Sequence, residues 1–385
     1  MVSLLLPAAD HAMNRLLLNE PARLDVRSTP PVSRAVYAAA HVVADPLRAS
    51  TADRGDSVDW DGTMRLRHDL WSLGLGVAES MDTAQRGMGL DWPAAKELAL
   101  RTLAEARSVG GRVVVGVGTD QLTTGSPSLH EICDAYIEQI EAVESAGGEV
   151  VLMASRDLAR AATGADDYLT VYDAVLASAT RPVVLHWLGA MFDPALTGYW
   201  GFTEPRAAMD TVVRIINNHV RAVRGIKVSL LDPALEIELR ERILEPARVF
   251  TGDDFNYVDL IAGDGNRSSD ALLGAFAVIA PFASAAFARL DVGDEKGFRD
   301  ILGPTEALSR LVFAAPTQYY KVGVAWLAYL NGRQDHFRMI GGFETGRSLQ
   351  HLAELIRAGD AIGLFADPAL TAARASAYFA VHGLT

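Results

Sequence analysis

Lys227 stands in a short apolar stretch, RGIKVSLLD (residues 224–232), near the point where a buried strand is expected to end. An isolated ammonium group in apolar surroundings loses several kcal/mol of hydration free energy unless it is paired, deprotonated or used. Burial lowers the pKa of a lysine, and the neutral amine can then attack a carbonyl compound and form a Schiff base. The same position also suits an ion pair with a neighbouring carboxylate. The residue type and its surroundings therefore point either to a nucleophile or to a buried salt bridge.

His186 occupies a similar stretch, VVLHWLG (residues 183–189). Its imidazole suits proton transfer because the ordinary pKa of histidine lies near neutrality. If the ring faces the interior of the fold, His186 can act as acid and base for a reaction at Lys227. A histidine in a strand can equally be a hydrogen-bonded core residue, so the pattern leaves both roles open.

Polar residues follow several other apolar stretches, where the ends of parallel strands would bring them together. Asp253 and Asp254 form an acidic pair that could hold a metal ion, tune the lysine or cap the next helix. We expect Lys227 and His186 to be the catalytic pair. A second group of residues is expected to bind the substrate. These are Glu79, Thr119, Asp120, Ser155, Asp253, Asp254 and Asn256.

A divalent metal ion is the alternative cofactor, because His41, His186, Glu79 and Asp253 are of the types that bind such ions in lyases and isomerases. No short ligand motif such as H-E-x-x-H is present. The single cysteine, Cys133, excludes an intramolecular disulfide and a thiolate-rich metal site. If no cofactor is used, the chemistry open to Lys227 is a covalent lysine intermediate. A metal-dependent lyase or isomerase is the second hypothesis.

The elements that must position these residues are short apolar runs rich in Val and Ile, separated by stretches with helical spacing. Such continuous runs are typical of parallel strands that are covered on both faces. Eight β/α units over roughly 250 residues match a closed (β/α)8 barrel, whose active groups lie at the carboxyl ends of the strands. An open doubly wound sheet is the competitor, but no G-x-G-x-x-G turn follows the first run. The predicted strands are 35–43, 73–79, 111–118, 148–155, 181–188, 223–230, 247–254 and 275–282.

Three parts follow one another along the chain: an irregular N-terminal arm over residues 1–32, the barrel over 33–290, and a helical extension over 291–385 that packs on the barrel. The formal net charge of −13 argues against a general nucleic-acid-binding protein, which needs a basic face. The start of the chain has no basic segment and no unbroken apolar run, so it predicts neither a signal peptide nor a membrane span. We expect a cytoplasmic protein that acts on a small molecule.

Around Lys227 the chain resembles the dihydrodipicolinate synthase / N-acetylneuraminate lyase superfamily of class I aldolases. GIK (225–227) is similar to the Schiff-base segment on the sixth strand of that superfamily, FTGDD (250–254) to its seventh strand, and PVVLHWLG (182–189) to its fifth. Longer segments, among them GVAESMDTAQRGMGLDW and HWLGAMFDPALTGYWG, look like an uncharacterised bacterial family of dihydrodipicolinate-synthase-like proteins, a domain of unknown function. The resemblance implies a barrel with C-terminal helices and an imine at Lys227.

Two departures from the superfamily change the expected chemistry. Its proton-relaying tyrosine on the fifth strand falls on His186, and its carboxylate-binding loop with paired threonines falls on GLGVAES (74–80). We therefore expect a lyase or aldolase for a small oxo acid or a sugar-derived oxo compound, rather than an enzyme that makes dihydrodipicolinate. The resemblance also implies a homo-oligomer, either a dimer or a tetramer. A third hypothesis, of another class, is a barrel that binds a metabolite without catalysis.

Overall fold

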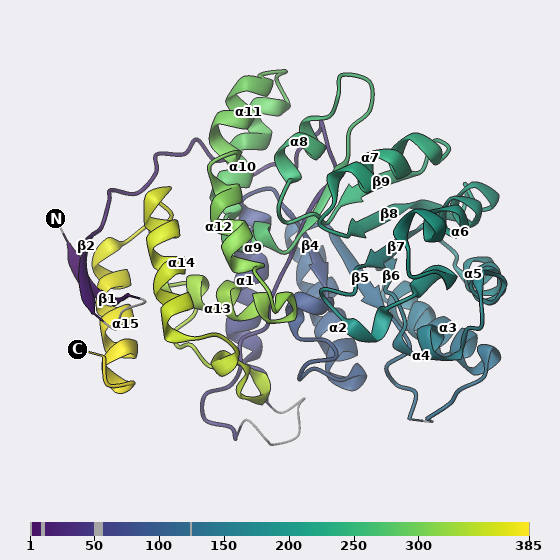
Figure 1. The fold of residues 1–385 in the computed structure, drawn as a ribbon, viewed down its shortest axis with the longest axis horizontal. Coiled ribbons are helices and arrows are strands. Elements are labelled where there is room, and N and C mark those ends of the chain that lie inside the picture. Colours follow the sequence, from purple (N-terminus) through teal and green to yellow (C-terminus); the bar gives the residue numbers. More distant parts are fainter. Residues whose placement is uncertain (1, 9–11, 50–56, 124, 385) are drawn as a thin grey trace.

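A closed barrel of eight parallel strands forms the centre of the computed structural model, which describes residues 2–8, 12–49, 57–123 and 125–384 (Figure 1). Each strand pairs with its neighbour in sequence, and the last strand closes the barrel against the first. The barrel predicted from the apolar runs is therefore confirmed. Its strands are β3 (Val36–Ala39), β4 (Gly76–Glu79), β5 (Val113–Val117), β6 (Glu149–Leu152), β7 (Val183–Leu188), β8 (Val223–Ser229), β9 (Arg248–Thr251) and β10 (Asp270–Leu273).

Alternate residues of the strands face the barrel interior, where they form an apolar cluster separate from the one between strands and helices. Val184 on β7 and Phe250 on β9 both belong to this interior cluster. His186 lies two residues after Val184, and Lys227 is the register partner of His186 on one side and Phe250 on the other. His186 and Lys227 therefore face the interior, side by side on adjacent strands.

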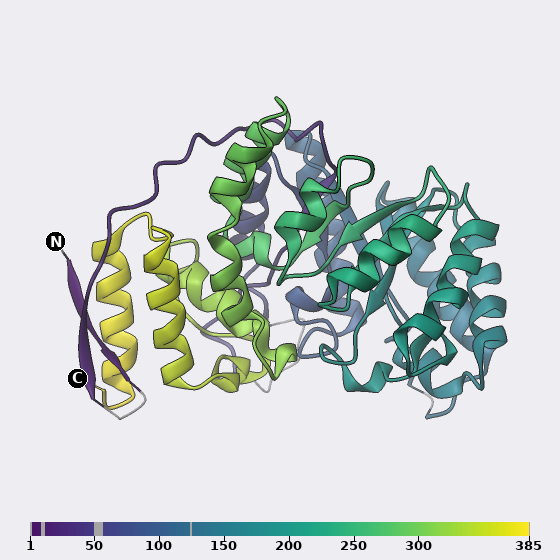
Figure 2. The same ribbon diagram turned by 45° about the horizontal axis from the view of Figure 1, so that its top comes forward.

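Helices cover the outside of the barrel and connect one strand to the next (Figures 1 and 2). Several begin at a capping side chain: Asp59, Asp91 and Asp232 each accept a hydrogen bond from an N–H in the first turn. Ser128 and Glu131 form a capping box at another helix start. The helices are α1 (Trp60–Ser72), α2 (Trp92–Val109), α3 (Leu129–Ser145), α4 (Arg156–Ala161), α5 (Ala165–Ser178), α6 (Pro205–Asn218), α7 (Pro233–Arg242) and α8 (Tyr257–Ala262), with the 3-10 turns η2 (Asp82–Ala84), η3 (Pro194–Leu196) and η4 (Tyr199–Gly201).

The eighth strand lies at residues 270–273, so its predicted position at 275–282 is wrong. The apolar run AFAVIAPF forms α9 (Ala275–Val278) and the start of α10 (Ala280–Leu290) instead. A short run that is apolar on all sides does not distinguish a strand from a buried helix by its periodicity. Pro281, in the first turn of α10, suits a helix start. The true strand, DALL, is only four residues long and begins with a charged residue, which concealed it.

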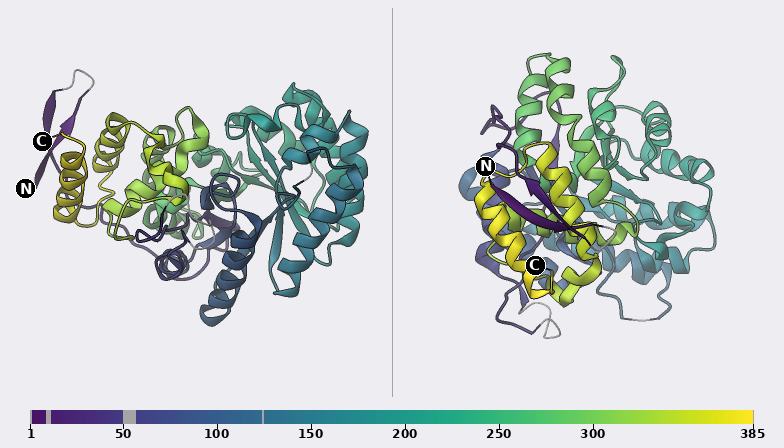
Figure 3. Two further views of the ribbon diagram at one scale, coloured as in Figure 1. Left: turned by 90° about the horizontal axis from the view of Figure 1, so that it is seen from below. Right: turned by 60° about the vertical axis from the view of Figure 1, so that its left-hand side comes forward.

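A helical extension, drawn in green and yellow, lies against one side of the barrel (Figures 1 and 3). At its centre α13 is buried on nearly all sides and packs against α9, α12, α14 and α15. Within the described ranges, no helix combines the length and the apolar character needed to cross a membrane. The elements of the extension are α11 (Glu295–Leu302), α12 (Thr305–Val312), η5 (Thr317–Tyr319), α13 (Tyr320–Leu330), η6 (Ile340–Gly346), α14 (Leu349–Ala361) and α15 (Pro368–Val381).

The N-terminal arm is not irregular throughout, because β1 (Ser3–Pro7) and β2 (Met13–Leu17) form an antiparallel hairpin. The hairpin packs against α14 and α15 at the end of the molecule farthest from the barrel (Figure 3). Its alternation explains this position, since Leu4 and Leu6 point inward and are buried. Beyond the hairpin the chain runs without helix or strand to the barrel. The arm thus covers the extension before it enters the barrel.

Candidate active site

A cavity of about 420 Å³ opens at the carboxyl ends of β5, β6 and β7, where the loops that follow these strands meet. Its wall combines hydroxyl, carboxylate and guanidinium groups with a few apolar side chains. Four residues predicted from the sequence line it: Thr119, Asp120, Ser155 and His186. This is the end of the barrel at which a (β/α)8 enzyme carries its reactive groups.

Lys227 lies on β8, is 7% exposed, and stands beside His186. Lys227 does not line the cavity itself, but His186 and Asp82 do. Burial lowers the pKa of the Lys227 ammonium group, while the charges of Asp82 and Asp254 oppose that shift. Among the described residues, its Nζ atom has no hydrogen-bond or ion-pair partner. The buried salt bridge that was the alternative role is not formed, so the amine is easier to deprotonate than an ordinary lysine.

His186 is fully buried, and only its Nε2 atom has a partner, the Ser229 hydroxyl oxygen at 3.3 Å. Its Nδ1 atom is buried with no hydrogen-bond partner in the described part of the chain. Burial and then the charge of Lys227 lower the pKa of the ring well below its ordinary value. The imidazole is therefore neutral at neutral pH and has a nitrogen free to exchange a proton. A core histidine with a purely structural role would have both nitrogens paired.

Asp254 follows β9 and is buried. Burial raises the pKa of its carboxyl group to about 7, although an N–H from Ala275 at 2.8 Å and the charge of Lys227 oppose the rise. The acid and the amine thus both have pKa values displaced toward neutrality. Moving a proton between such groups costs little free energy, which suits general acid–base chemistry.

Tyr320, at the start of α13, brings a phenol to the same place from the helical extension. Its hydroxyl lies 2.7 Å from the Thr83 hydroxyl oxygen. Burial raises the pKa of Tyr320 well above its ordinary value, and the charges of Asp82 and Asp254 add to the rise. The same two carboxylates act on Lys227. The Lys227 amine and the Tyr320 phenol therefore both lie close to the carboxylates of Asp82 and Asp254.

A chain of hydroxyl groups forms one wall of the cavity. The Thr119 hydroxyl lies 2.6 Å from the Ser155 hydroxyl and donates a hydrogen bond of 2.7 Å to Asp157. Asp120 is held differently, because Arg86 donates two hydrogen bonds to its carboxylate, at 2.9 and 2.5 Å. Although burial disfavours ionisation, Arg86 holds the pKa of Asp120 below its ordinary value. Thr119 and Ser155 thus suit a hydroxylated ligand, whereas Asp120 is a permanent anion paired with an arginine.

Two further cations stand near the cavity. Arg156 lines it and pairs with Asp193, Nε to carboxylate oxygen 2.6 Å. Lys321, from α13, is buried, and its pKa is lowered to about 8 by burial, with Asp82 opposing. Its Nζ atom lies 3.2 Å from the Met88 sulfur, and among the described residues it has no carboxylate partner. Such a cation suits the carboxylate of an incoming ligand.

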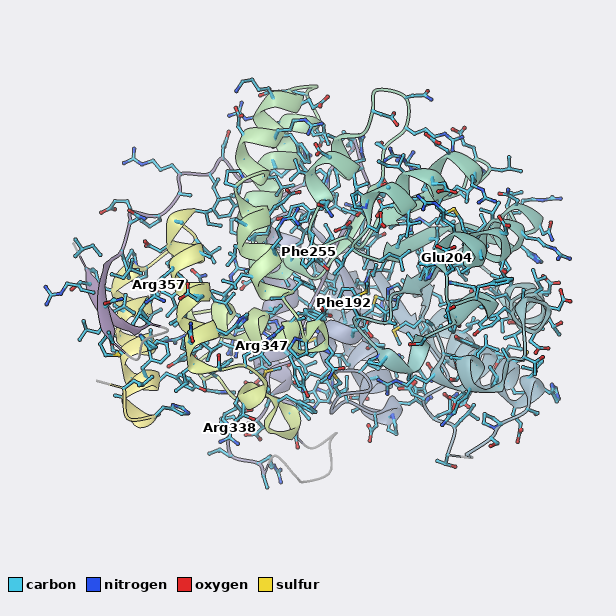
Figure 4. All side chains as sticks on the ribbon, in the orientation of Figure 1. Phe192, Glu204, Phe255, Arg338, Arg347 and Arg357 are labelled. Atoms are coloured by element: carbon cyan, nitrogen blue, oxygen red, sulfur yellow. The ribbon has the colours of Figure 1, made fainter. Side chains whose placement is uncertain are left out.

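Aromatic contacts join the mouth of the barrel to the extension. Phe192, in the loop after β7, packs edge-on against Phe313 and Tyr320, with ring centroids 6.3 and 6.0 Å apart. Figure 4 shows Phe192 where the barrel meets the extension. The extension is therefore part of the site, and does not merely cover the barrel.

Glu79 does not face the cavity, so the prediction that it binds substrate is wrong. It points outward from β4 and accepts two hydrogen bonds from Arg67, at 2.8 and 2.9 Å, and one from Thr102 at 2.6 Å. Glu79 and Arg67 are fully buried. Because strand side chains alternate, a residue one position from the inward-facing Ala78 must face the helices.

Asp253 and Asn256 serve the local backbone and do not line the cavity. Asp253 is buried and accepts hydrogen bonds from the N–H groups of Phe255 and Asn256, at 2.9 and 3.0 Å. Asn256 in turn accepts a hydrogen bond of 2.7 Å from Arg310. Asp253 thus holds the turn before α8, whose N-cap residue, Asn256, makes no side-chain capping hydrogen bond. The capping role considered for the acidic pair is therefore not filled, and Asp254 lies near the lysine.

The residues considered as metal ligands are not brought together. His41 lies 2.7 Å from the Gln334 side-chain oxygen, and Glu79 is paired with Arg67. In residues 2–8, 12–49, 57–123 and 125–384, no group of three or more His, Cys, Asp or Glu side chains is arranged to hold a metal ion.

Sequence reasoning missed four residues that shape the site: Tyr320, Lys321, Arg86 and Asp157. Tyr320 and Lys321 begin an otherwise apolar helix, YYKVGVAWLAYLNG, and a lysine in such a helix is a signal of the kind that singled out Lys227. Arg86 lies in the loop after β4 and Asp157 in the first turn of α4, just after β6, where every polar residue is a candidate. Their position carried no further signal.

Comparison with known protein families decides the relationship of the chain. The profile of a family described as "Protein of unknown function (DUF993)" matches residues 4–384. The chain belongs to this family. No curated protein matches it.

Solved structures with the same fold come from dihydrodipicolinate synthases. This DUF993 chain superimposes on dihydrodipicolinate synthase from Aquifex aeolicus with a TM-score of 0.65 at 13% identity, and on the one from Thermotoga maritima with 0.63 at 15%. YagE, a prophage protein of the dihydrodipicolinic acid synthase family from E. coli K12 solved in complex with pyruvate, gives 0.66 at 16%. Each match covers 86% of this chain and 99% of the other. The fold of that family, barrel and C-terminal helices, is thus shared.

Proposed function

We propose that this protein is a class I lyase or aldolase that forms a Schiff base between Lys227 and a small oxo acid or sugar-derived oxo compound. The observation that carries the proposal is the state of Lys227: buried inside the barrel, with a lowered pKa and no polar partner among the described residues, beside a histidine with a free nitrogen. The shared fold supports it, since one structure with that fold, YagE, contains pyruvate.

The reaction begins when the neutral Lys227 amine attacks the carbonyl carbon. A proton passes from nitrogen to oxygen and gives a carbinolamine. A neighbouring acid then donates a proton to its hydroxyl group, which leaves as water, and the nitrogen lone pair forms the C=N bond of a protonated imine. The positive nitrogen then accepts the electron pair released when a proton or a carbon group leaves the adjacent carbon. A proton that is removed from the substrate in one step must be returned in a later step of the reaction. The site therefore needs side chains that can both accept and donate a proton near neutral pH.

The surroundings of Lys227 supply such groups. Neutral His186 can take a proton from the carbon adjacent to the imine, through the ring nitrogen that has no partner. Asp254, with a pKa of about 7, can exchange the protons that leave with water. Tyr320 can donate a hydrogen bond to a developing alkoxide and remain uncharged, because its pKa is raised. In this proposal His186, Asp254 and Tyr320 transfer the protons that a tyrosine on the fifth strand relays in the dihydrodipicolinate synthase superfamily.

The cavity favours an oxo acid that carries hydroxyl groups. Lys321 and Arg156 offer positive charge for a carboxylate. The hydroxyls of Thr119 and Ser155, with Asp157 behind them, match alcohol groups of a sugar-derived chain. We propose that the working form is a homo-oligomer in the cytoplasm, a prediction that sedimentation velocity and fractionation of cells would check.

Borohydride trapping tests the imine. The protein is incubated with pyruvate and with a panel of longer oxo acids, reduced with borohydride and weighed by mass spectrometry. We expect a mass increase equal to the oxo acid less water plus two hydrogens, located on the peptide that contains Lys227 and absent from Lys227→Met.

Lys321→Met is the matched control, because Lys321 is also a buried lysine with a lowered pKa. It should still form the adduct, with weaker uptake at low substrate concentration. An adduct on Lys321 instead of Lys227, or no adduct with any carbonyl compound tried, would contradict the proposal.

A further inference from the structure

A second and larger cavity, of about 960 Å³, lies at the opposite end of the barrel, where the strands begin. Val113, Glu149 and Val223 line it, and each stands at the first position of its strand. The catalytic groups described above stand at the other end. Reactive residues of (β/α)8 enzymes lie at the carboxyl ends of the strands, so this cavity has no part in the proposed reaction.

The charge of this cavity is opposite to that of the whole chain. Five arginines line it, with one carboxylate, Glu149, in a protein whose formal net charge is −13. The arginines come from separate parts of the sequence: Arg107, Arg112, Arg181, Arg221 and Arg224. Cations held together in one hollow repel each other, and the repulsion is relieved when an anion binds between them.

Arg112 has hydrogen-bonding capacity that the protein leaves unused. Its Nε and Nη2 atoms are buried, and neither has a hydrogen-bond partner in the described part of the chain. Its guanidinium lies over the ring of Tyr37, with 5.9 Å between the central carbon and the ring centroid. Buried polar atoms of this kind are normally paired, so their freedom indicates a missing partner.

Arg224 is aimed into the cavity by an irregularity of the barrel. The register between β7 and β8 shifts at this point, so that Val183 pairs with Val223 and Val184 with Gly225, which leaves Arg224 as an extra residue. The side chain lies over the rings of Tyr37 and Phe250, 5.8 and 5.6 Å away. Its charge is shared with Glu149, Nη1 to carboxylate oxygen 2.5 Å.

The remaining arginines keep most of their donors available. Arg107 and Arg181 each use one Nη1 atom, on the carbonyl oxygens of Ala146 and Gly147, both at 2.9 Å. Arg221 is exposed and makes no hydrogen bond or ion pair with the described residues. After Glu149 has neutralised one guanidinium, four positive charges face the cavity.

We propose that this cavity is a binding site for a small organic phosphate carrying two or more negative charges. The fork of a guanidinium matches two oxygens of a phosphate, and several forks around one hollow suit a polyphosphate better than a single carboxylate. The apolar part of the ligand packs on Tyr37 and on the side chains of Leu103, Ala106 and Val220, which complete the wall. This inference does not depend on the Schiff base, because the two sites lie at opposite ends of the barrel.

Isothermal titration calorimetry of the full-length protein with ATP, inorganic pyrophosphate and adenosine tests the site. ATP and pyrophosphate should bind, with affinity that falls as salt is raised, and adenosine should not. Tighter binding of ATP than of pyrophosphate supports an organic phosphate as the ligand, and the reverse order contradicts it. Arg112→Ala should weaken binding at least about tenfold, because it removes one of the positive charges that line the cavity.

Arg221→Ala is the second variant, since an exposed arginine without a partner can be removed without loss of folding. It should weaken binding several-fold. Arg156→Ala is the matched control, because Arg156 lines the other cavity, and it should leave ATP binding unchanged. The inference is overturned if neither phosphate binds, if citrate binds more tightly than both, or if Arg156→Ala alone abolishes binding. Trapping at Lys227 is measured separately, so failure here leaves the proposed reaction untouched.

Discussion

Glu79 and Lys227 are both charged groups buried at the carboxyl ends of barrel strands, but they face opposite ways. Glu79 faces the helices, and its two oxygens accept four hydrogen bonds, two from Arg67 and one each from Thr102 and the Ser80 N–H. Lys227 faces the interior and has no partner among the described residues. Burial alone therefore does not distinguish a structural charge from a reactive one.

The difference lies in whether the burial of the charge is compensated. A buried ion whose hydrogen-bonding positions are all occupied stabilises the arrangement around it, and little remains for a ligand. A buried ion without partners loses its hydration and shifts its pKa, which makes its neutral form available for chemistry. Inside the barrel His186 and Asp254 have shifted pKa values as well. The interior therefore carries titratable groups with shifted pKa values, and the outer layer carries a paired charge.

The largest effect is expected from His186→Gln, which removes the proton-accepting nitrogen from the interior. The imine at Lys227 should still form, whereas exchange of the pyruvate methyl protons with deuterium from solvent should slow by about 10²–10⁴-fold. Proton NMR of pyruvate in deuterated buffer measures the exchange. Exchange at the normal rate with a normal adduct would show that another group removes the proton.

Removal of the Glu79 carboxylate from its pair with Arg67 should lower stability and leave adduct formation at Lys227 intact. Glu79→Ala leaves the Arg67 guanidinium buried without its carboxylate, and we expect the free energy of unfolding to fall by about 3–5 kcal/mol. Lys227→Met, the matched change in the interior, should alter it by less than about 1 kcal/mol or raise it, because an uncompensated charge is removed. Urea unfolding of the two variants gives both values. Equal losses in the two would mean that Lys227 is structurally paired after all.

The smallest effect is a pH dependence carried by Asp254. Its pKa of about 7 in the folded protein lies above the value of about 4 for an unfolded chain. Its protonated form therefore contributes stability that is fully present below about pH 4 and is lost as the pH rises to about 7. Asp254→Asn does not titrate, so it should become more stable relative to wild type between about pH 5 and pH 8.

Asp120→Asn is the control for that measurement. Arg86 holds the pKa of Asp120 below its ordinary value, so its contribution to stability is constant above about pH 5. The difference in the free energy of unfolding between Asp120→Asn and wild type should not change with pH over the range in which the difference for Asp254→Asn grows. Urea unfolding at pH 5 and pH 8 measures both differences. If the difference between Asp254→Asn and wild type is the same at the two pH values, the raised pKa of Asp254 is contradicted.

The barrel and the buried position of Lys227 were predictable because both depend on local composition. Continuous Val- and Ile-rich runs can be buried on two faces only in a covered parallel sheet, and seven of the eight predicted runs contain the strands observed. Lys227 and His186 were identified because each interrupts such a run. The eighth strand was missed because AFAVIAPF is apolar on every side and fits a buried helix equally well.

Other features were decided by the tertiary structure. Whether Glu79 faces the cavity or the helices turns on a shift of one residue, since strand side chains alternate, and an apolar run does not mark where its strand starts. Tyr320 and Lys321 come close to Asp82 from a helix some ninety residues later than Lys227 in the sequence, because α13 packs against the barrel mouth. The sequence by itself therefore determined that Lys227 and His186 lie in buried strands of the barrel. Only the closed barrel and its extension decided which buried charged residues are paired and which are left free to react.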